Sequence, residues 1–370
     1  MRERLPVAGP GAASPREAPQ RAGRLQGLDV ARALAIFGMV VVNVEVSLGG
    51  AERDPGLLAD LSALLRGRAA ATFVVLAGVG ISLLGERARL QGGPRDRRRV
   101  RRLLAARGAF LFGLGLALMA VGWWPDILHF YGFYLAFAAW LFDAAARTLR
   151  RAAFVCVALF YAALPLYERG WVEGSLEYAD VWTPLGFAHN TFLNGLHPVF
   201  PWFVFIVWGL WLGRQDLRDR RVLRRMVLGG CGVAVATELA CGALEPWAGP
   251  ELAPLVATDM LPPGLPYLLA AGGAATALIG ACSWATQRVP NARLWAALGP
   301  FGRHALTWYV GHVLLLIFPL VAAGADTHGG IKLVWGVALA FSAATMAASG
   351  IWARRHARGP LSALMRRVTG

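Results

Sequence analysis

Long apolar runs, separated by short polar segments, set the pattern of the chain. About 20 apolar residues span the roughly 30 Å hydrocarbon core of a bilayer, so each run is predicted to be one transmembrane helix. The ten predicted spans cover approximately residues 28–48, 69–86, 103–122, 127–146, 152–167, 198–213, 226–244, 264–285, 303–322 and 332–352. The pattern therefore predicts an all-α fold, a polytopic integral membrane helix bundle.

The basic residues test this topology. If the N-terminus is cytoplasmic and successive spans alternate, the arginine clusters at 87–102, 147–151, 214–225 and 354–367 all fall on the cytoplasmic side. The basic residues that fall on the outer side are Arg53, Arg66, Arg68, Arg169 and Lys332. Positive residues concentrate on the cytoplasmic side of membrane proteins. We therefore expect both termini in the cytoplasm and a location in the bacterial inner membrane.

Composition narrows the class of protein. The chain of 370 residues is 56% hydrophobic, well above the apolar share of about 45–50% in soluble proteins. Its net charge of +15 comes from arginines placed between apolar runs, which favours a lipid bilayer as partner and argues against nucleic acid. Residues 1–23 lack an apolar core and are predicted to be a disordered basic tail. Residues 24–370 are predicted to form a single multi-pass domain of unknown oligomeric state.

Charged residues occur inside the first predicted helix. Asp29 and Arg32 are three residues apart and share a helix face. Asn43 falls within about 60° of the same stripe. Polar groups at membrane depth normally face the bundle interior and find partners there. The stripe is either part of a ligand site or an ion pair that reaches to the cytoplasmic interface.

A second polar stretch is FGRHALTWYVGH, residues 301–312. Arg303 and Thr307 align on one helix face, and His312 lies about ten residues into the predicted span, near the middle of the membrane. An ionisable residue at that depth is a candidate functional group. The alternative is a histidine that only hydrogen-bonds between helices.

Two further histidines are predicted near the outer surface. His129 follows the turn made by Pro125 and Asp126, and Asp126 is well placed to cap the next helix. His197 lies where the 198–213 span begins. Either one can act as a general base on a substrate from outside, because histidine titrates near working pH. The outer connection 168–197 is predicted to be either a lid over an acceptor site or an interfacial cap.

Several motifs, taken in order, resemble the YeiB-like bacterial membrane proteins and their relatives, the heparan-alpha-glucosaminide N-acetyltransferases. They are RLQGLDVARALAIFGMVVVN, GRAAATFVVLAGVGISL, PDILHFYG, HPVFPWFVFIVWGLWLGR, GRHALTWYVGH and GPLSALMRR. The resemblance covers nearly the whole chain from residue 24. In the heparan enzyme, a histidine in the outer connection after the first helix is catalytic. The corresponding connection here, SLGGAERDPGLLADLSALLRGRA, has no histidine, and related bacterial histidines near the end of the first helix are replaced by Asn43.

The resemblance implies a transmembrane acyltransferase. Acyl-coenzyme A is the implied co-substrate, bound from the cytoplasm, and the acceptor is an extracytoplasmic glycan or lipid. The predicted donor-binding residues are Asp29, Arg32, Arg303 and Thr307, and the predicted catalytic residues are His129, His197 and His312. No tightly bound cofactor and no metal are expected. The competing hypothesis is a transporter or lipid-handling protein that uses the same polar residues without covalent chemistry.

Overall fold

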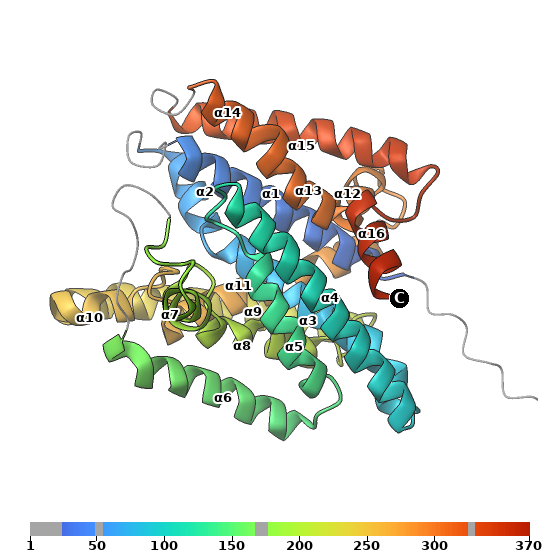
Figure 1. Ribbon diagram of the computed structural model, residues 1–370, viewed down its shortest axis with the longest axis horizontal. Helices are drawn as coiled ribbons and strands as arrows, with labels where there is room; N and C mark the ends of the chain where they lie inside the picture. The colour runs from blue at the N-terminus through green and yellow to red at the C-terminus, as the bar shows by residue number, and fades with distance from the viewer. Residues whose placement is uncertain (1–23, 49–54, 167–176, 325–329) are drawn as a thin grey trace, which may run out of the picture.

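The protein is a bundle of helices in which the first long helix, Gln26–Leu48, packs against several others (Figure 1). A computed structural model describes residues 24–48, 55–166, 177–324 and 330–370, so the predicted N-terminal tail lies outside the described residues. The α-helices are α1 (Gln26–Leu48), α2 (Leu57–Leu65), α3 (Arg68–Leu90), α4 (Pro94–Ala120), α5 (Leu128–Leu141), α6 (Ala146–Ala163), α7 (Pro184–His189), α8 (Val199–Leu212), α9 (Arg220–Leu244), α10 (Gly249–Val256), α11 (Leu265–Arg288), α12 (Arg293–Arg303), α13 (Ala305–His312), α14 (Phe318–Ala322), α15 (Ile331–Ala353) and α16 (Pro360–Thr369). Short 3₁₀ or π segments are η1 (Leu164–Leu166), η2 (Asn190–Asn194), η3 (Glu245–Trp247) and η4 (Val313–Ile317). The described residues contain no β-strand, which confirms the all-α prediction.

Each of the ten predicted spans corresponds to a helix, but the helices differ in length. In the described part of the chain, eight are long and apolar enough to cross a bilayer, or nine if the bent pair Pro184–Asn194 and Val199–Leu212 counts as one span. Helix α5 has 14 residues, about 21 Å at 1.5 Å per residue, which is less than the thickness of a hydrocarbon core. The chain is thus a multi-pass membrane protein, while ten crossings and cytoplasmic termini stay predictions.

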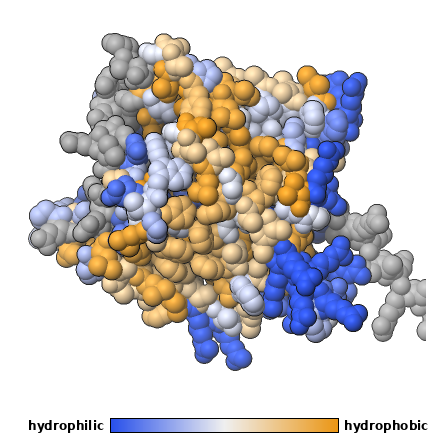
Figure 2. Space-filling view, in the orientation of Figure 1, coloured by the Kyte–Doolittle hydropathy of each residue, from blue (hydrophilic) through white to orange (hydrophobic). Residues whose placement is uncertain are grey.

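The surface has the polarity of a membrane protein. Figure 2 shows a broad hydrophobic band, with strongly hydrophilic residues gathered at the end where α16 and the first turns of α4 lie in Figure 1. Large apolar side chains on the outer helices are exposed, including Phe154 of α6 and Leu239 of α9. We call the hydrophilic end the arginine-rich end, because the residues that begin α4 include Arg95, Arg97 and Arg98.

Glycines let two of the central helices approach closely. A Cβ added at Gly209 of α8 would overlap the carbonyl oxygen of Val75 in α3, and one added at Gly78 of α3 would overlap that of Ile206 in α8. Small residues at helix contacts are a general device for close packing in membranes. Gly78 and Gly209 therefore serve the close packing of α3 against α8. Gly113 of α4, in contrast, has open space where its Cβ would stand.

Replacing Gly78 with leucine is expected to lower thermal stability, because α3 and α8 must separate to accept the side chain. Overpacking of this kind typically costs about 1–3 kcal/mol. Thermal unfolding of the purified protein in detergent measures the effect, with Gly113→Leu as the matched control. Equal melting temperatures for the two variants would show that the α3–α8 contact is not tightly packed.

Candidate functional site

A large cavity opens at the arginine-rich end of the bundle. Its volume is about 1010 Å³, at the upper end of the range for small-molecule sites. The wall is formed by the start of α1, the end of α3, parts of α4 and α5, the connection between α8 and α9, and Met365 of α16. The arginines that line it are Arg24, Arg32, Arg107, Arg214 and Arg218. We call this space the arginine cavity.

Asp29 organises the arginines on α1. Its carboxylate is buried and accepts hydrogen bonds from Arg24 Nε at 2.5 Å, Arg24 Nη2 at 3.0 Å and Arg32 Nη1 at 3.0 Å. The hydrogen bond to Asp29 raises the pKa of Arg24, so this guanidinium stays charged. The ion pair predicted from the i, i+3 spacing of Asp29 and Arg32 is confirmed, and both residues line the arginine cavity.

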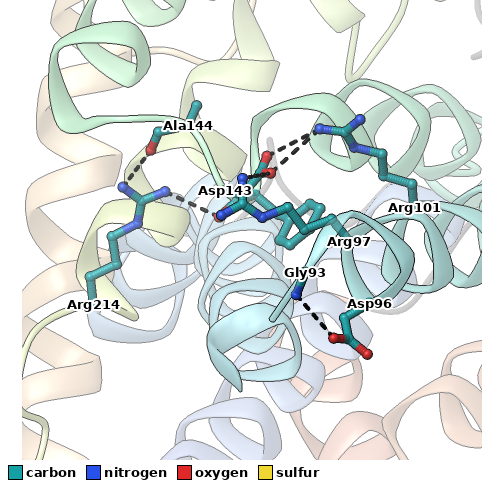
Figure 3. Close-up of polar contacts among 8 residues, drawn as sticks. Gly93, Asp96, Arg97, Arg101, Asp143, Ala144 and Arg214 are labelled. Carbon is teal, nitrogen blue, oxygen red and sulfur yellow. Dashed lines mark hydrogen bonds and ion pairs between the residues drawn. The ribbon is translucent and has the colours of Figure 1, made fainter. Parts of the chain in front are cut away.

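Arg214 fixes the connection between α8 and α9 at the cavity wall (Figure 3). Its Nη1 donates to the carbonyl of Ala144 at 2.7 Å, and its Nη2 to the carbonyl of Phe142 at 3.2 Å. Burial lowers the pKa of Arg214, but a guanidinium remains protonated in proteins. Asp143, in the same turn, pairs with Arg97 at 3.6 Å and Arg101 at 3.4 Å. The turn after α5 is thereby tied to both α4 and the α8–α9 connection.

His129 lies at the opposite end of α5, in a buried polar pair with Asp126. The Asp126 Oδ2 atom accepts the backbone N–H of His129 at 2.9 Å, which is the capping bond predicted from the sequence. The same oxygen lies 3.1 Å from His129 Nδ1. If Nδ1 donates to the carboxylate, the lone pair of the ring is on Nε2. That Nε2 is buried and has no hydrogen-bond partner in the part of the chain that the structure describes.

A tyrosine and a second histidine from α13 approach this pair. Tyr309 donates from its hydroxyl to Asp126 Oδ1 at 3.4 Å and accepts the backbone N–H of Ile127 at 3.1 Å. His312 Nε2 lies 2.9 Å from Asn43 Nδ2, and its ring is 5.2 Å from that of Tyr309. Asn43 on α1 is thus in contact with a histidine supplied by α13.

His197 completes this group from the start of α8. Its ring lies 5.9 Å from Phe130 and 4.7 Å from Trp202, and its Nδ1 is buried without a partner. It lines a pocket of about 80 Å³ together with Asn43. A neighbouring pocket of about 10 Å³, the size of one water, is lined by His129, and Leu196 borders both.

The three histidines predicted from distant parts of the sequence are therefore joined through shared neighbours. Phe130 contacts the rings of both His129 and His197, and Tyr309 connects His312 with the Asp126 carboxylate. We call His129, His197 and His312, with Asp126, Asn43 and Tyr309, the histidine cluster.

Helix α5 lies between the arginine cavity and the histidine cluster. Tyr131 lines the cavity and its buried hydroxyl has no partner, while His129, two residues earlier, belongs to the cluster. Two residues of α-helix advance about 3 Å. On the same helix, Tyr134 donates from its hydroxyl to the carbonyl of His197 at 2.7 Å. Helix α5 is thus the wall between the two polar regions.

Comparison with known families decides the class of protein. A family model described as heparan-alpha-glucosaminide N-acetyltransferase, catalytic, matches residues 24–233, more than half of the chain. The chain belongs to this family. A second model, described as a protein of unknown function (DUF418), matches residues 211–370. No curated protein matches the chain. The family predicted from the motifs is confirmed, and the chain is an acetyltransferase-like membrane protein.

The two matched regions of this acetyltransferase-like chain both contribute to the histidine cluster. His129 and His197 lie within residues 24–233, and Tyr309 and His312 lie within residues 211–370. The arginine cavity draws its arginines from the first region and Met365 from the second. Both halves of the chain are needed to build the two polar regions.

The structure separates two predicted donor-binding residues from the cavity. Thr307 accepts the backbone N–H of Leu361 at 3.2 Å and so holds the start of α16. Arg303 lies at the end of α12, where burial lowers its pKa, and it does not line the arginine cavity. The helix predicted over 303–322 starts at Ala305, because the chain breaks at His304 and Arg303 ends the preceding helix, α12. Asp29, Arg32, Arg303 and His312 therefore do not share one cavity.

Several cavity and cluster residues were missed from the sequence. Arg214 belongs to a cluster that the positive-inside rule already explains, so nothing singled it out. Arg107 lies inside the predicted 103–122 span, and an ionisable residue there is a signal that could have found it. Tyr309 is three residues before His312 and shares its helix face. This spacing is a signal by which Tyr309 could have been found from the sequence. Tyr131 is two residues after His129, and only the packing of α5 shows that it reaches the cavity.

The outer connection predicted as a lid or cap is described only from residue 177 onward. Tyr178 and Val181 pack against Met119 of α4, and the ring of Phe187 in α7 lies 6.1 Å from that of His129. This part of the connection covers the histidine cluster. The two predicted roles stay open, because residues 167–176 lie outside the described residues.

Proposed function

We propose that the protein transfers an acetyl group from acetyl-coenzyme A, bound in the arginine cavity, to an amine or hydroxyl acceptor on the outer side of the bacterial inner membrane. The observation that carries the proposal is the buried Nε2 of His129, which has no partner among the described residues and lies two residues along α5 from Tyr131 in the wall of an arginine-lined cavity. The family name describes transfer to a glucosaminide. A glycan amine is therefore the first acceptor to test, with membrane lipids second.

The arginine cavity suits the donor. Coenzyme A carries a diphosphate and a further phosphate, and guanidinium groups bind phosphate oxygens through paired, charge-assisted hydrogen bonds. Arg32 is the best placed of these groups, because Asp29 fixes its orientation and its side chain is still 26% exposed. The acyl-bearing arm would then extend toward Tyr131. Coenzyme A in this scheme is a co-substrate, not a resident cofactor.

The histidine cluster supplies the acid–base chemistry. His129 Nε2 takes the proton from the acceptor N–H or O–H as the acceptor attacks the thioester carbonyl. The new C–N or C–O bond forms, the C–S bond breaks, and the coenzyme A thiolate receives the proton that His129 took from the acceptor, which returns His129 to its neutral form. Asp126 holds the imidazole in the required tautomer and stabilises its protonated form, the role of the carboxylate in other histidine-based sites. His197 and the Asn43–His312 pair line the side from which the acceptor approaches.

A substitution at Gly80 tests the donor site. A Cβ there would lie 3.6 Å from Arg32 Nη2, so Gly80→Trp places an indole in the arginine cavity. We expect calorimetric binding of coenzyme A to be lost in this variant and retained in Gly113→Trp, which projects into open space. Both variants are checked for unchanged melting temperature. Undiminished binding by a folded Gly80→Trp variant would place the donor elsewhere.

The transport hypothesis makes a different prediction. A carrier that uses the same polar residues would move a substrate across vesicles without acetyl-coenzyme A, and its flux would survive loss of His129. Labelled acetyl-coenzyme A, supplied to purified protein with glucosamine or extracted membrane lipids, distinguishes the two. Labelled acceptor supports acetyl transfer, and donor-independent flux with no labelled product supports transport.

A further inference from the structure

An apolar groove runs between α6, α8, α9 and α11, apart from the histidine cluster. It encloses about 620 Å³. On α9 its lining runs from Val222 to Val233, about 16 Å at 1.5 Å per residue. That length is at least the depth of one leaflet of hydrocarbon, about 15 Å. We call it the tryptophan groove, after Trp208 and Trp211 in its wall.

The two tryptophans form a fixed apolar surface. Their rings stack at 4.8 Å with an interplanar angle of 27°. Trp208 donates from Nε1 to the hydroxyl of Thr276 at 2.8 Å, and that hydroxyl donates in turn to the carbonyl of Gly272 at 2.7 Å. The polar atoms of Trp208 and Thr276 are thereby used within the protein.

Glycines keep the groove open. Gly229 of α9 and Gly272 of α11 both line it. A Cβ at Gly229 would meet no atom within 4 Å, and one at Gly272 would meet only Phe205, at 3.8 Å. Larger side chains at these positions would fill the groove without disturbing the contact of α9 with α11, which is made through Gly230 and Gly273.

The groove has a polar mouth at one end. Gln215 and Arg225 line this mouth, and Arg225 is exposed. Arg221 and Arg224 of the same helix are also exposed. The long apolar interior and the cationic mouth complement an acyl chain attached to a phosphate-bearing headgroup. Cationic clusters at the membrane surface attract anionic lipids in this way.

We propose that the tryptophan groove binds one anionic glycerophospholipid, with an acyl chain along Trp208 and Trp211 and its phosphate at Arg225. The exposed arginine at the mouth and the length of the apolar interior match the phosphate and one acyl chain of this ligand. The proposal does not depend on acetyl transfer.

Lipid retention by the purified full-length protein tests the site. The protein is delipidated in detergent, incubated with phosphatidylglycerol or phosphatidylcholine, and examined by native mass spectrometry. We expect the wild type to retain one phosphatidylglycerol per chain. Gly229→Leu should reduce retention at least tenfold. Gly232→Leu, three residues further on α9 and also facing open space, should retain it like the wild type.

The headgroup contact is tested separately. Arg225→Gln should lose the preference for phosphatidylglycerol over phosphatidylcholine, while Arg354→Gln, the same change in charge at an exposed arginine that does not line the groove, should keep it. The proposal is overturned if the wild type retains no lipid, or if each variant matches its control. A lipid-free dimer that Gly229→Leu converts to monomer would identify the groove as an interface between copies and would also overturn it.

Discussion

Replacing His129 with asparagine is expected to reduce acetyl transfer by about 100- to 10,000-fold, the usual contribution of a general base. Among the described residues, the buried Nε2 of His129 has no hydrogen-bond partner, and Asp126 lies against the other ring nitrogen, so Nε2 is placed to act as the base. Binding of coenzyme A should be unchanged, because His129 does not line the arginine cavity. Initial rates with labelled acetyl-coenzyme A measure the first effect and calorimetry the second.

The matched control for this variant is His356→Asn. His356 is exposed after α15 and stacks on Trp352 at 4.2 Å, away from the histidine cluster. Its loss should leave the rate unchanged. A His129→Asn variant that melts normally and transfers acetyl groups at the wild-type rate would remove His129 as the base, and the same assay on His197→Asn and His312→Asn would then locate it.

Replacing Arg32 with methionine should raise the KM for acetyl-coenzyme A by roughly 10- to 100-fold with little change in kcat. Hydrogen bonds to charged groups contribute about 1.5–3 kcal/mol, and 1.4 kcal/mol is a tenfold change in affinity. The fold should survive, because Asp29 keeps both of its bonds to Arg24. Steady-state kinetics against donor concentration measure the change.

Arg147→Met is the control for charge alone, since Arg147 is an exposed arginine of α6 that does not line the cavity. Arg303→Met, measured in parallel, decides the donor-binding role that the sequence predicts for Arg303. An unchanged KM in the Arg32 variant would contradict the assignment of the arginine cavity to the donor.

Local features of the site could be predicted because helical spacing sets them. Asp29 and Arg32 are one turn apart, and Asp126 precedes a helix start, so their contacts follow from the sequence alone. The contact of Asn43 with His312 joins residues 269 positions apart. Periodicity shows which face of a helix is polar, but the neighbour of that face depends on how helices slide and rotate against each other.

The place of Arg303 depends on helix packing. The sequence groups Arg303 with Arg32 because both are expected at the cytoplasmic ends of helices, and its donor-binding role stays a prediction. A Cβ at Gly302 would overlap the carbonyl oxygen of Asp29, so α12 packs directly on the backbone of α1, and Arg303 is held outside the cavity. Arg214 gives no separate signal, because an arginine at a helix end serves topology whether or not it binds a ligand.

The most direct test of the central claim is a cryo-EM structure of the full-length protein with acetyl-coenzyme A. We expect the phosphates beside Arg32 in the arginine cavity and the acetyl end directed along α5 past Tyr131 toward His129. Donor density at another site, or an empty arginine cavity at a donor concentration that saturates calorimetric binding, would contradict the account.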